Sequence, residues 1–329
     1  FMISILIGTI ACSLLGLMVQ WMAFLIVFLI AKVGFSASLI FYDSMLSDIT
    51  DEERMDYVSS QGYAWGYIGS CVPFVLCLVI VLGSDPLGTH METAMGIAFV
   101  LVAVWWLLMS LPLLKNYEQK YYVEKKPHAI AQSFKRLGET FKNMKEEKQV
   151  FMFLLAFFFY IDGVYTIIDM ATAYGSALGL DSTGLLLALL VTQIVAFPCA
   201  IIFGNLSYRI RTEKLIIVCI FAYLGIAIFA VFLKTQLQFW ILAILVGMFQ
   251  GGIQALSRSY FTKIIPEEHS GEYFGLMDIC GKGASFVGTT IVSIVSQLTG
   301  NISMGVGMIA ILFCIGIVIF LKAVSMSRN

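Results

Sequence analysis

Charge is scarce in this sequence of 329 residues. Only 12% of the residues are charged, whereas an average soluble domain carries about 25%. Hydrophobic residues make up 60%, and the mean hydropathy is +0.91. Too few polar side chains are present to cover a surface in water. The composition therefore excludes a soluble globular protein and predicts one that resides in a lipid bilayer.

Patterns for metal binding, disulfide formation and catalysis are also lacking. The seven cysteines all lie inside apolar segments and form no CxxC pair, so we expect them to pack as small apolar side chains. The three histidines lie in expected loops. No nucleophile stands beside a base in the sequence. We therefore expect no metal site, no cofactor, no nucleic-acid partner and no enzymatic activity.

Long apolar segments are present instead. A membrane-spanning helix needs about 20 apolar residues, and several charge-free segments are longer than that. The first is divided near Gln20 and the last at residues 299–301, where polar and glycine residues interrupt them. Ten spans are then predicted, over residues 1–18, 21–45, 58–83, 93–114, 150–174, 183–206, 215–233, 237–259, 273–298 and 302–322.

Lys and Arg are distributed unevenly between the loops. Segment 115–148 alone holds nine of the twenty basic residues, and eight more fall in loops expected on the same side, namely Arg54, Arg209, Arg211, Lys214, Arg258, Lys263, Lys322 and Arg328. The opposite loops hold only Lys234. Cytoplasmic loops of membrane proteins carry the excess of basic residues. We therefore expect the long loop and the C-terminus in the cytoplasm.

The long loop has a pattern of its own. Apolar residues recur there at alternating spacings of four and three, with basic residues between them, at Ile130, Phe134, Leu137, Phe141 and Met144. This spacing predicts an amphipathic helix on the inner membrane surface. Its simplest role is that of a linker, with regulation or partner binding as the alternative.

A weak internal repeat relates two parts of the chain that are 215 residues apart. Segments 48–72 (DITDEERMDYVSSQGYAWGYIGSCV) and 263–287 (KIIPEEHSGEYFGLMDICGKGASFV) share identical residues at Ile49/Ile264, Glu52/Glu267, Glu53/Glu268, Gly66/Gly281, Ser70/Ser285 and Val72/Val287. Each copy starts with an acidic cluster after one apolar span and continues into the next span. Such a repeat is typical of a transporter built from two similar bundles.

The offset of the repeat also predicts the fold class. It leaves residues 150–206 without a counterpart, so we expect two further helices before Phe1. Taken as helices three to twelve of a six-plus-six scheme with a long basic loop between the halves, the ten spans resemble the major facilitator architecture, which implies an all-α membrane protein with two pseudo-symmetric six-helix bundles. The expected domains are an N-terminal bundle over 1–114, a cytoplasmic linker over 115–148 and a C-terminal bundle over 149–329.

Three longer segments make the resemblance more specific. FYDSMLSDITDEERMDYVSSQGYAWGYIGS (41–70), FFFYIDGVYTIIDMATAYG (157–175) and GGIQALSRSYFTKIIPEEHSGEYFGLMDICGKGASFVGT (251–289) resemble the vacuole effluxer-like family, the autophagy-related branch of the major facilitators. This resemblance implies a permease. Export of amino acids from the vacuole is the best-known role of its fungal members, and the substrates of bacterial members are largely unassigned.

One loop departs from the superfamily pattern. GNLSYRIRTEK (204–214) is similar to the major facilitator loop in which glycine is followed by an Asp-Arg pair and further basic residues. Tyr208 stands where the acid is expected, and Arg211 replaces the second glycine. The sequence therefore favours an anchor at the cytoplasmic surface over a gating salt bridge at this loop.

Five charged residues fall inside apolar spans: Lys32, Asp162, Asp169, Asp278 and Lys282. At about 3 kcal/mol each on insertion scales, five lipid-facing charges would together cost about 15 kcal/mol. They must therefore be paired, neutralised or turned toward a hydrated cavity. Asp278 and Lys282 are four residues apart on one helix face, so we expect them to pair with each other.

The remaining polar positions predict a substrate or ion site. Lys32 is expected near mid-depth in helix four, and Asp162, Thr166 and Asp169 form one stripe on helix seven, with Tyr165 beside it. Gln250 and Gln254 form a polar face on helix ten, and Arg258 lies near its cytoplasmic end as a gate or structural residue. The alternative is a polar clamp between helices that orders the bundle.

We therefore expect a multi-pass secondary transporter that works by alternating access, with the lipid bilayer and a small-molecule substrate as its partners. Amino acids are favoured because a carboxylate and an ammonium group could meet Lys32 and Asp162, and protons could be coupled through Asp162. The alternatives are a carrier for a sugar or a drug-like solute, and a non-transporting membrane sensor or scaffold. The expected location is the bacterial cell membrane, or the vacuolar membrane if the source is a fungus.

Overall fold

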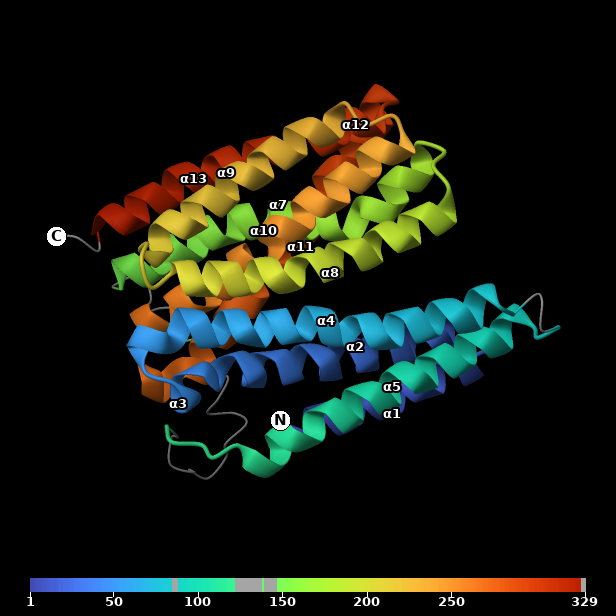
Figure 1. Ribbon diagram of the computed structural model, residues 1–329, viewed down its shortest axis with the longest axis horizontal. Helices are drawn as coiled ribbons and strands as arrows, with labels where there is room; N and C mark the ends of the chain where they lie inside the picture. Colours follow the sequence, from blue (N-terminus) through green and yellow to red (C-terminus); the bar gives the residue numbers. More distant parts are fainter. Residues whose placement is uncertain (85–87, 122–137, 139–146, 327–329) are drawn as a thin grey trace. The chain divides into compact units, whose positions relative to one another are not determined.

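The computed structural model describes residues 1–84, 88–121, 138 and 147–326, and these residues form helices and no β-strand (Figure 1). The elements, with η for a 3₁₀ helix, are α1 (Met2–Leu14), η1 (Leu15–Leu17), α2 (Trp21–Ser44), α3 (Leu46–Ile49), η2 (Glu52–Arg54), α4 (Met55–Leu82), α5 (Met91–Asn116), α7 (Lys148–Ala177), α8 (Ser182–Leu206), α9 (Thr212–Val231), α10 (Gln236–Ile264), η3 (Glu267–His269), α11 (Ser270–Thr299), α12 (Ile302–Gly307) and α13 (Ile309–Met326). The predicted all-α class is confirmed. The amphipathic helix predicted around residues 130–144 lies outside the described residues.

The predicted spans match these helices closely. Within the described ranges, nine helical segments are long and apolar enough to cross a membrane, and Met2–Leu17 is a shorter apolar helix. The predicted break near Gln20 is present because Gln20 is the N-cap residue of α2. The break at residues 299–301 is present because Gly300 adopts a φ of 66°, which glycine tolerates and which ends α11.

The two repeat copies have the same local structure. In each copy the acidic cluster forms a 3₁₀ turn, η2 or η3, that leads directly into a long apolar helix, α4 or α11. Acidic residues at this position are stabilised by the partial positive charge at the N-terminal end of the following helix. The first residues of the two copies, Asp48 and Lys263, differ in charge, and each makes polar contacts of its own that are described below.

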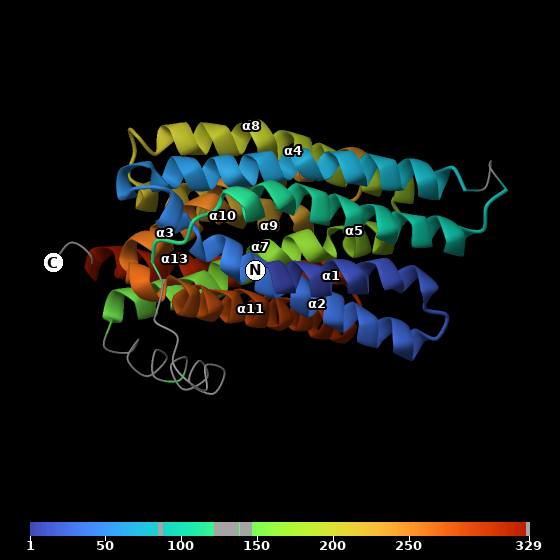
Figure 2. The same ribbon diagram turned by 90° about the horizontal axis from the view of Figure 1, so that it is seen from below.

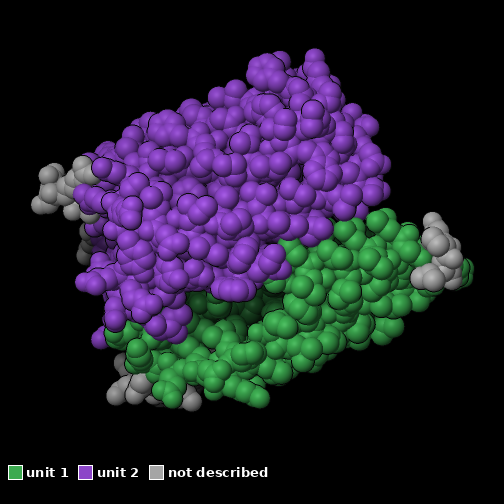
Figure 3. Space-filling view, viewed as in Figure 1, with its two compact units in different colours: residues 1–48, 69–121 green, residues 49–68, 122–329 purple. Residues whose placement is uncertain are grey.

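Contacts divide the chain into two units, which Figure 3 distinguishes by colour. Unit 1 comprises residues 1–48 and 69–121, and unit 2 comprises residues 49–68 and 122–329. In unit 1, α1 packs against α2 and α5; in unit 2, α7 packs against α11 and α13, and α10 packs against α8 and α9 (Figures 1 and 2). The first half of α4 thus packs within unit 2. The domain boundaries at 114 and 149 stay a prediction, because packing contacts do not reveal where two related halves begin.

Helices α7 and α10 form the centre of unit 2 and are the most buried of the apolar spans. Their shared core is aromatic: the ring of Phe153 lies 5.5 Å from that of Phe261 and 5.3 Å from that of Tyr260, measured between ring centres. Helix α10 starts with a capping box, in which Thr235 and Gln238 each bond the backbone of the other. These two helices carry most of the candidate site residues.

Cysteine labelling tests the predicted orientation. In a cysteine-free background, single cysteines at Thr89, before α5, and at Lys120, after α5, should react from opposite sides of intact cells, because α5 is long and apolar enough to cross the membrane. We expect Lys120 on the cytoplasmic side, next to the basic loop. Labelling of Lys120→Cys by an impermeant reagent from outside would show that the orientation is inverted.

Candidate functional site

The candidate residues lie in both units. Lys32 is on α2 in unit 1, where it is exposed and its Nζ lies 5.7 Å from the centre of the Phe35 ring. All the other candidates are in unit 2. The expectation that Lys32 and Asp162 meet the two charged groups of one solute stays a prediction.

Asp162 is the most enclosed of the predicted acids, with 0% of its surface exposed. Its Oδ1 accepts hydrogen bonds from the Thr166 hydroxyl at 3.2 Å and from the backbone N–H of Gly288, on α11, at 3.0 Å. Its Oδ2 is buried and has no hydrogen-bond partner among the described residues. A buried carboxylate with one free oxygen can bind a proton or a cation, since an unpaired charge is costly in an apolar environment.

Glycine at position 288 makes this arrangement possible. A Cβ atom at Gly288 would lie 2.2 Å from Oδ1 of Asp162 and 2.3 Å from the hydroxyl oxygen of Thr166, and both distances are shorter than any ordinary contact. On the same helix, Gly275 and Gly283 have no atom within 4 Å of such a Cβ. Of these three glycines, Gly288 alone is required for a close approach.

The other residues of the predicted stripe on α7 also contact α11. Asp169 is exposed, and its Oδ2 accepts a hydrogen bond of 3.2 Å from the Ser285 hydroxyl. Tyr165, three residues after Asp162, is half-buried, and its ring would lie 3.4 Å from a Cβ at Gly281. The acidic stripe of α7 therefore faces α11.

The glutamines of α10 have different surroundings. Gln254 is half-buried, and its Oε1 accepts a hydrogen bond of 2.6 Å from the Tyr67 hydroxyl of α4. Gln250 is buried and lines a cavity between α7, α8 and α10. Both glutamines thus interact with Tyr67 of α4, and Gln250 also lines the cavity.

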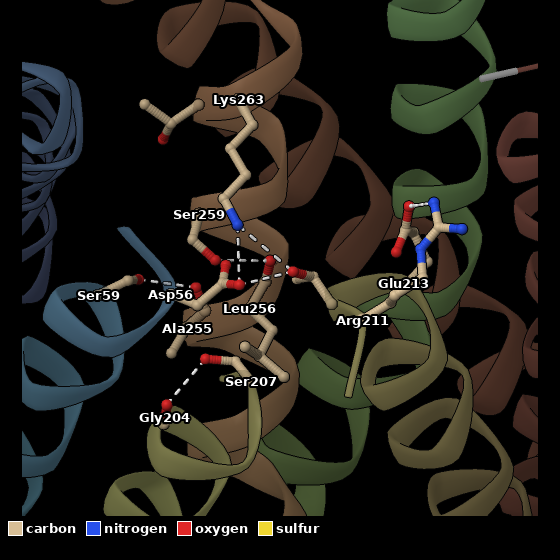
Figure 4. Close-up of polar contacts among 12 residues, drawn as sticks. Asp56, Ser59, Gly204, Ser207, Arg211, Glu213, Ala255, Leu256, Ser259 and Lys263 are labelled. Carbon is tan, nitrogen blue, oxygen red and sulfur yellow. Dashed lines mark hydrogen bonds and ion pairs between the residues drawn. The ribbon is translucent and has the colours of Figure 1, made fainter. Parts of the chain in front are cut away.

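Arg258 binds the first half of α4. It is 4% exposed, and it donates hydrogen bonds to the hydroxyl oxygen of Ser59 at 2.9 Å and to the carbonyl oxygen of Ser59 at 3.0 Å. Its guanidinium carbon lies 4.8 Å from the centre of the Tyr63 ring, which is cation–π geometry. Ser59 also donates to the carbonyl oxygen of Ala255 at 2.7 Å (Figure 4).

A second polar cluster lies beside Arg258, and the sequence analysis did not identify it. Oδ2 of Asp56, on α4, accepts a hydrogen bond from Nζ of Lys263 at 2.8 Å (Figure 4). It accepts another from the hydroxyl of Thr212 at 2.6 Å. Asp56 is 5% exposed. In the sequence these residues are two helix-end charges and a threonine, and only their burial reveals the cluster.

The loop GNLSYRIRTEK also contacts α4, through residues other than its basic ones. Thr212 binds Asp56, and the rings of Tyr208 and Tyr57 are 5.8 Å apart. A Cβ at Gly204 would lie 2.7 Å from the Cβ of Ser60, so α8 and α4 approach closely at this point. Arg211 is largely exposed and pairs with Glu213 (Figure 4).

The last two predicted residues pair with each other. Lys282 and Asp278 form an ion pair on one face of α11, four residues apart, and both are partly exposed. Exposed pairs of this kind contribute only about 0–1 kcal/mol to stability. This pair neutralises two membrane charges locally.

Unit 1 contains a further buried acid that the sequence analysis did not identify. Asp48 accepts hydrogen bonds from the Tyr117 hydroxyl and from the backbone N–H groups of Lys120 and Tyr121, at 3.1 and 3.0 Å. Partial burial, together with the adjacent Asp48 carboxylate, raises the pKa of Tyr117 above its usual range. The phenol therefore keeps its proton and its bond at neutral pH, and this stabilising contribution is lost only as the pH rises above about 10.

Replacing one lysine at a time tests whether the buried ion pair of the second cluster contributes more to stability than an exposed ion pair does. Lys263→Met leaves the buried Asp56 carboxylate without its cation, so we expect it to lower the free energy of unfolding by about 3 kcal/mol. The matched control, Lys282→Met, breaks an exposed pair and should cost less than about 1 kcal/mol. Adding Asp56→Asn should recover much of the loss, and equal melting temperatures for the two single variants would contradict this interpretation.

Comparisons with known proteins agree with this architecture. The profile of the family described as vacuole effluxer Atg22 like matches residues 47–329. The chain is 45% identical over 302 residues to the MFS-type transporter YxiO of Bacillus subtilis, covering 91% of this chain and 71% of that protein. It is 25% identical over 303 residues to Autophagy-related protein 22 of Botryotinia fuckeliana, covering 82% of this chain and 50% of that protein.

The fold has solved counterparts as well. A crystal structure of the fucose:proton symporter FucP of E. coli superimposes with a TM-score of 0.70 at 15% identity, covering 97% of this chain and 83% of that one. At that identity the likeness concerns the fold alone, and the fold is that of the major facilitators. With a profile match over most of the sequence and a bacterial relative at 45% identity, this chain belongs to the vacuole effluxer Atg22-like family of major facilitator transporters.

Proposed function

We propose that this chain is part of a secondary transporter for amino acids or similar small zwitterions, with Asp162 as the group that binds the coupled proton. The observation that carries the proposal is the buried carboxylate of Asp162, which has one oxygen engaged by Gly288 and Thr166 and one oxygen without a partner. A carboxyl group in an apolar environment that can exchange a proton with a cavity is the usual element of proton coupling in transporters.

The substrate class is supported by the resemblance to the family. The family is described as vacuole effluxers, and amino-acid export is the role that the sequence resemblance implies. The other proposed contacts of the substrate or the ion are Lys32, Tyr165, Thr166, Asp169, Gln250 and Gln254. The bacterial relative supports placement in a cell membrane, with the C-terminus in the cytoplasm as the basic loops predict.

The contacts of α4 support a gate at one end of unit 2. Arg258 bonds Ser59, and Lys263 and Thr212 bond Asp56, so four polar contacts hold the start of α4 to α9 and α10. Alternating access requires helix contacts at one end of the bundle that open and close. We propose that these contacts form when the bundle is closed at this end. They separate when the bundle is closed at the opposite end.

A thermal-shift screen with the purified protein tests the substrate class. A ligand present at a hundred times its Kd raises the free energy of unfolding by about 2.7 kcal/mol, so a substrate should raise the melting temperature measurably. We expect stabilisation by amino acids and none by sugars or amphipathic drugs. Stabilisation by a sugar alone would favour a sugar carrier, and no stabilisation together with no flux in proteoliposomes would favour a sensor or scaffold.

A further inference from the structure

A cavity in unit 2 lies on a different face of α7 from Asp162. It has a volume of about 50 Å³ and is lined by residues of α7, α8 and α10. Helix α7 contributes Ile167, Ile168 and Ala171 to its wall. Successive residues of an α-helix are about 100° apart around its axis, so the centre of this apolar face points about 180° away from Asp162, whose partners are on α11.

The polar groups of the cavity are all uncharged. Thr192, Gln193 and Gln250 are its polar lining residues, and the others are apolar. The Thr192 hydroxyl donates to the carbonyl oxygens of Ala188 and Ala243, at 3.0 and 3.1 Å, so its proton is already used. Oε1 of Gln193 is buried and has no partner among the described residues.

A buried acceptor without a partner favours a ligand that brings a donor. Leaving such an oxygen unpaired is unfavourable, and a bound O–H or N–H group would remove the penalty. A formal charge would be poorly placed here, because no side chain of opposite charge lines the cavity. The chemistry of the wall therefore suits an uncharged, partly apolar group that carries one hydrogen-bond donor.

We propose that this cavity binds the uncharged side chain of the transported solute, that Gln193 selects for a side chain with a hydrogen-bond donor, and that Asp162 does not touch the solute. This inference rests on the proposed function, which supplies the zwitterionic solute, and it goes further by separating two tasks. Selectivity is assigned to the α8 and α10 face of α7, and proton coupling is assigned to the α11 face.

L-threonine and L-valine are suitable probes, because they have nearly the same shape and differ by a hydroxyl in place of a methyl group. Binding to the purified protein is measured by thermal shift at several concentrations of each probe. We expect the wild-type protein to bind threonine about five- to tenfold more tightly than valine, which is the contribution of about one hydrogen bond. Gln193→Leu should remove this preference and should not lower the melting temperature, because it removes an unpaired polar group.

Three further variants make the test specific. Gln297→Leu changes an exposed glutamine of α11 outside the cavity and should leave the preference unchanged. Gln193→Met is a second uncharged variant for use if Gln193→Leu does not fold. Asp162→Asn should keep the threonine preference while it alters the pH dependence of flux, and Gln193→Leu should keep the pH dependence.

Each outcome is decisive. If both probes bind and their ratio is the same in the wild type, Gln193→Leu and Gln193→Met, the cavity does not select the side chain and the inference is wrong. If Asp162→Asn changes the ratio as much as Gln193→Leu does, the acid contacts the solute and the separation of tasks is wrong. If neither probe, nor any other amino acid, binds the wild type, then the proposed substrate class fails and this inference falls with it.

Discussion

Replacing Gly288 by alanine is expected to displace the Asp162 carboxyl group and to lower the transport rate more than tenfold. The new methyl group would lie 2.2 Å from Oδ1 of Asp162 and 2.3 Å from the Thr166 hydroxyl, so at least one of these groups must move. Overpacking of a buried site costs about 1–3 kcal/mol, and here the hydrogen bond from Gly288 to Asp162 would be lost as well. Flux of a radiolabelled amino acid in proteoliposomes measures the effect.

The displacement can also be measured without transport. A water-soluble carbodiimide modifies accessible carboxyl groups, and mass spectrometry gives the extent of reaction at Asp162. We expect faster modification in Gly288→Ala than in the wild type, because the carboxyl group no longer lies against α11. Gly283→Ala, on the same helix in open space, is the matched control and should behave as the wild type does. Wild-type flux and wild-type modification in Gly288→Ala would refute the role assigned to this glycine.

Replacing Asp162 by asparagine is expected to remove the pH dependence of transport and to leave the protein folded. Asparagine has the size of aspartate and keeps an oxygen that can accept from Gly288 and Thr166, but its amide does not take up a proton between pH 5 and 8. Occupancy of the wild-type carboxyl group by a proton falls as the pH rises. Flux in proteoliposomes from pH 5 to 8 should therefore vary for the wild type and stay flat for Asp162→Asn.

Asp169→Asn is the matched control for this experiment. Asp169 lies two helical turns along the same stripe, but it is exposed and bonded only by Ser285 among the contacts described above. We expect it to keep the pH dependence of the wild type. An unchanged pH profile in Asp162→Asn would make the acid a packing element, and a large fall in its melting temperature would favour the interhelical clamp. Lys32→Ala should move the profile toward higher pH if Lys32 lies near Asp162, because a nearby cation favours the charged form of a carboxyl group.

The two polar regions of unit 2 explain how one helix could serve two purposes. Helix α7 directs Asp162 and Asp169 toward α11, and it directs Ile167 and Ala171 toward the cavity with Gln193. In the proposed mechanism, a proton taken up by Asp162 would change the packing of α7 against α11, and the other face of the same helix lines the cavity. Coupling between the two sites would then pass through a displacement of α7, which requires no contact between proton and solute.

The membrane class and the helix order were readable from the sequence because they depend on local chemistry. A run of about 20 apolar residues has few stable conformations in lipid other than a helix, and Gln20 and Gly300 interrupt such runs for reasons that are local to the backbone. The repeat copies were visible for the same reason, since an acidic turn before an apolar helix is a pattern along the chain. An unpaired charge has a high free energy in lipid. The sequence therefore also showed that four charged residues need partners, namely Asp162, Asp169, Asp278 and Lys282.

The partners themselves were decided only by tertiary packing. Asp162 pairs with the backbone of Gly288, 126 residues away, and a backbone N–H carries no signal in a sequence. Asp56, Thr212 and Lys263 come from three helices, and the charges of Asp56 and Lys263 resemble those of any helix end until burial in a common site makes the three residues a cluster. Gln193 is one polar residue in an apolar span, and its unpaired oxygen exists only because α7, α8 and α10 enclose it. Sequence patterns predict whether a residue lies in an apolar or a polar environment. The neighbours that bond a buried polar atom are set by how the helices pack.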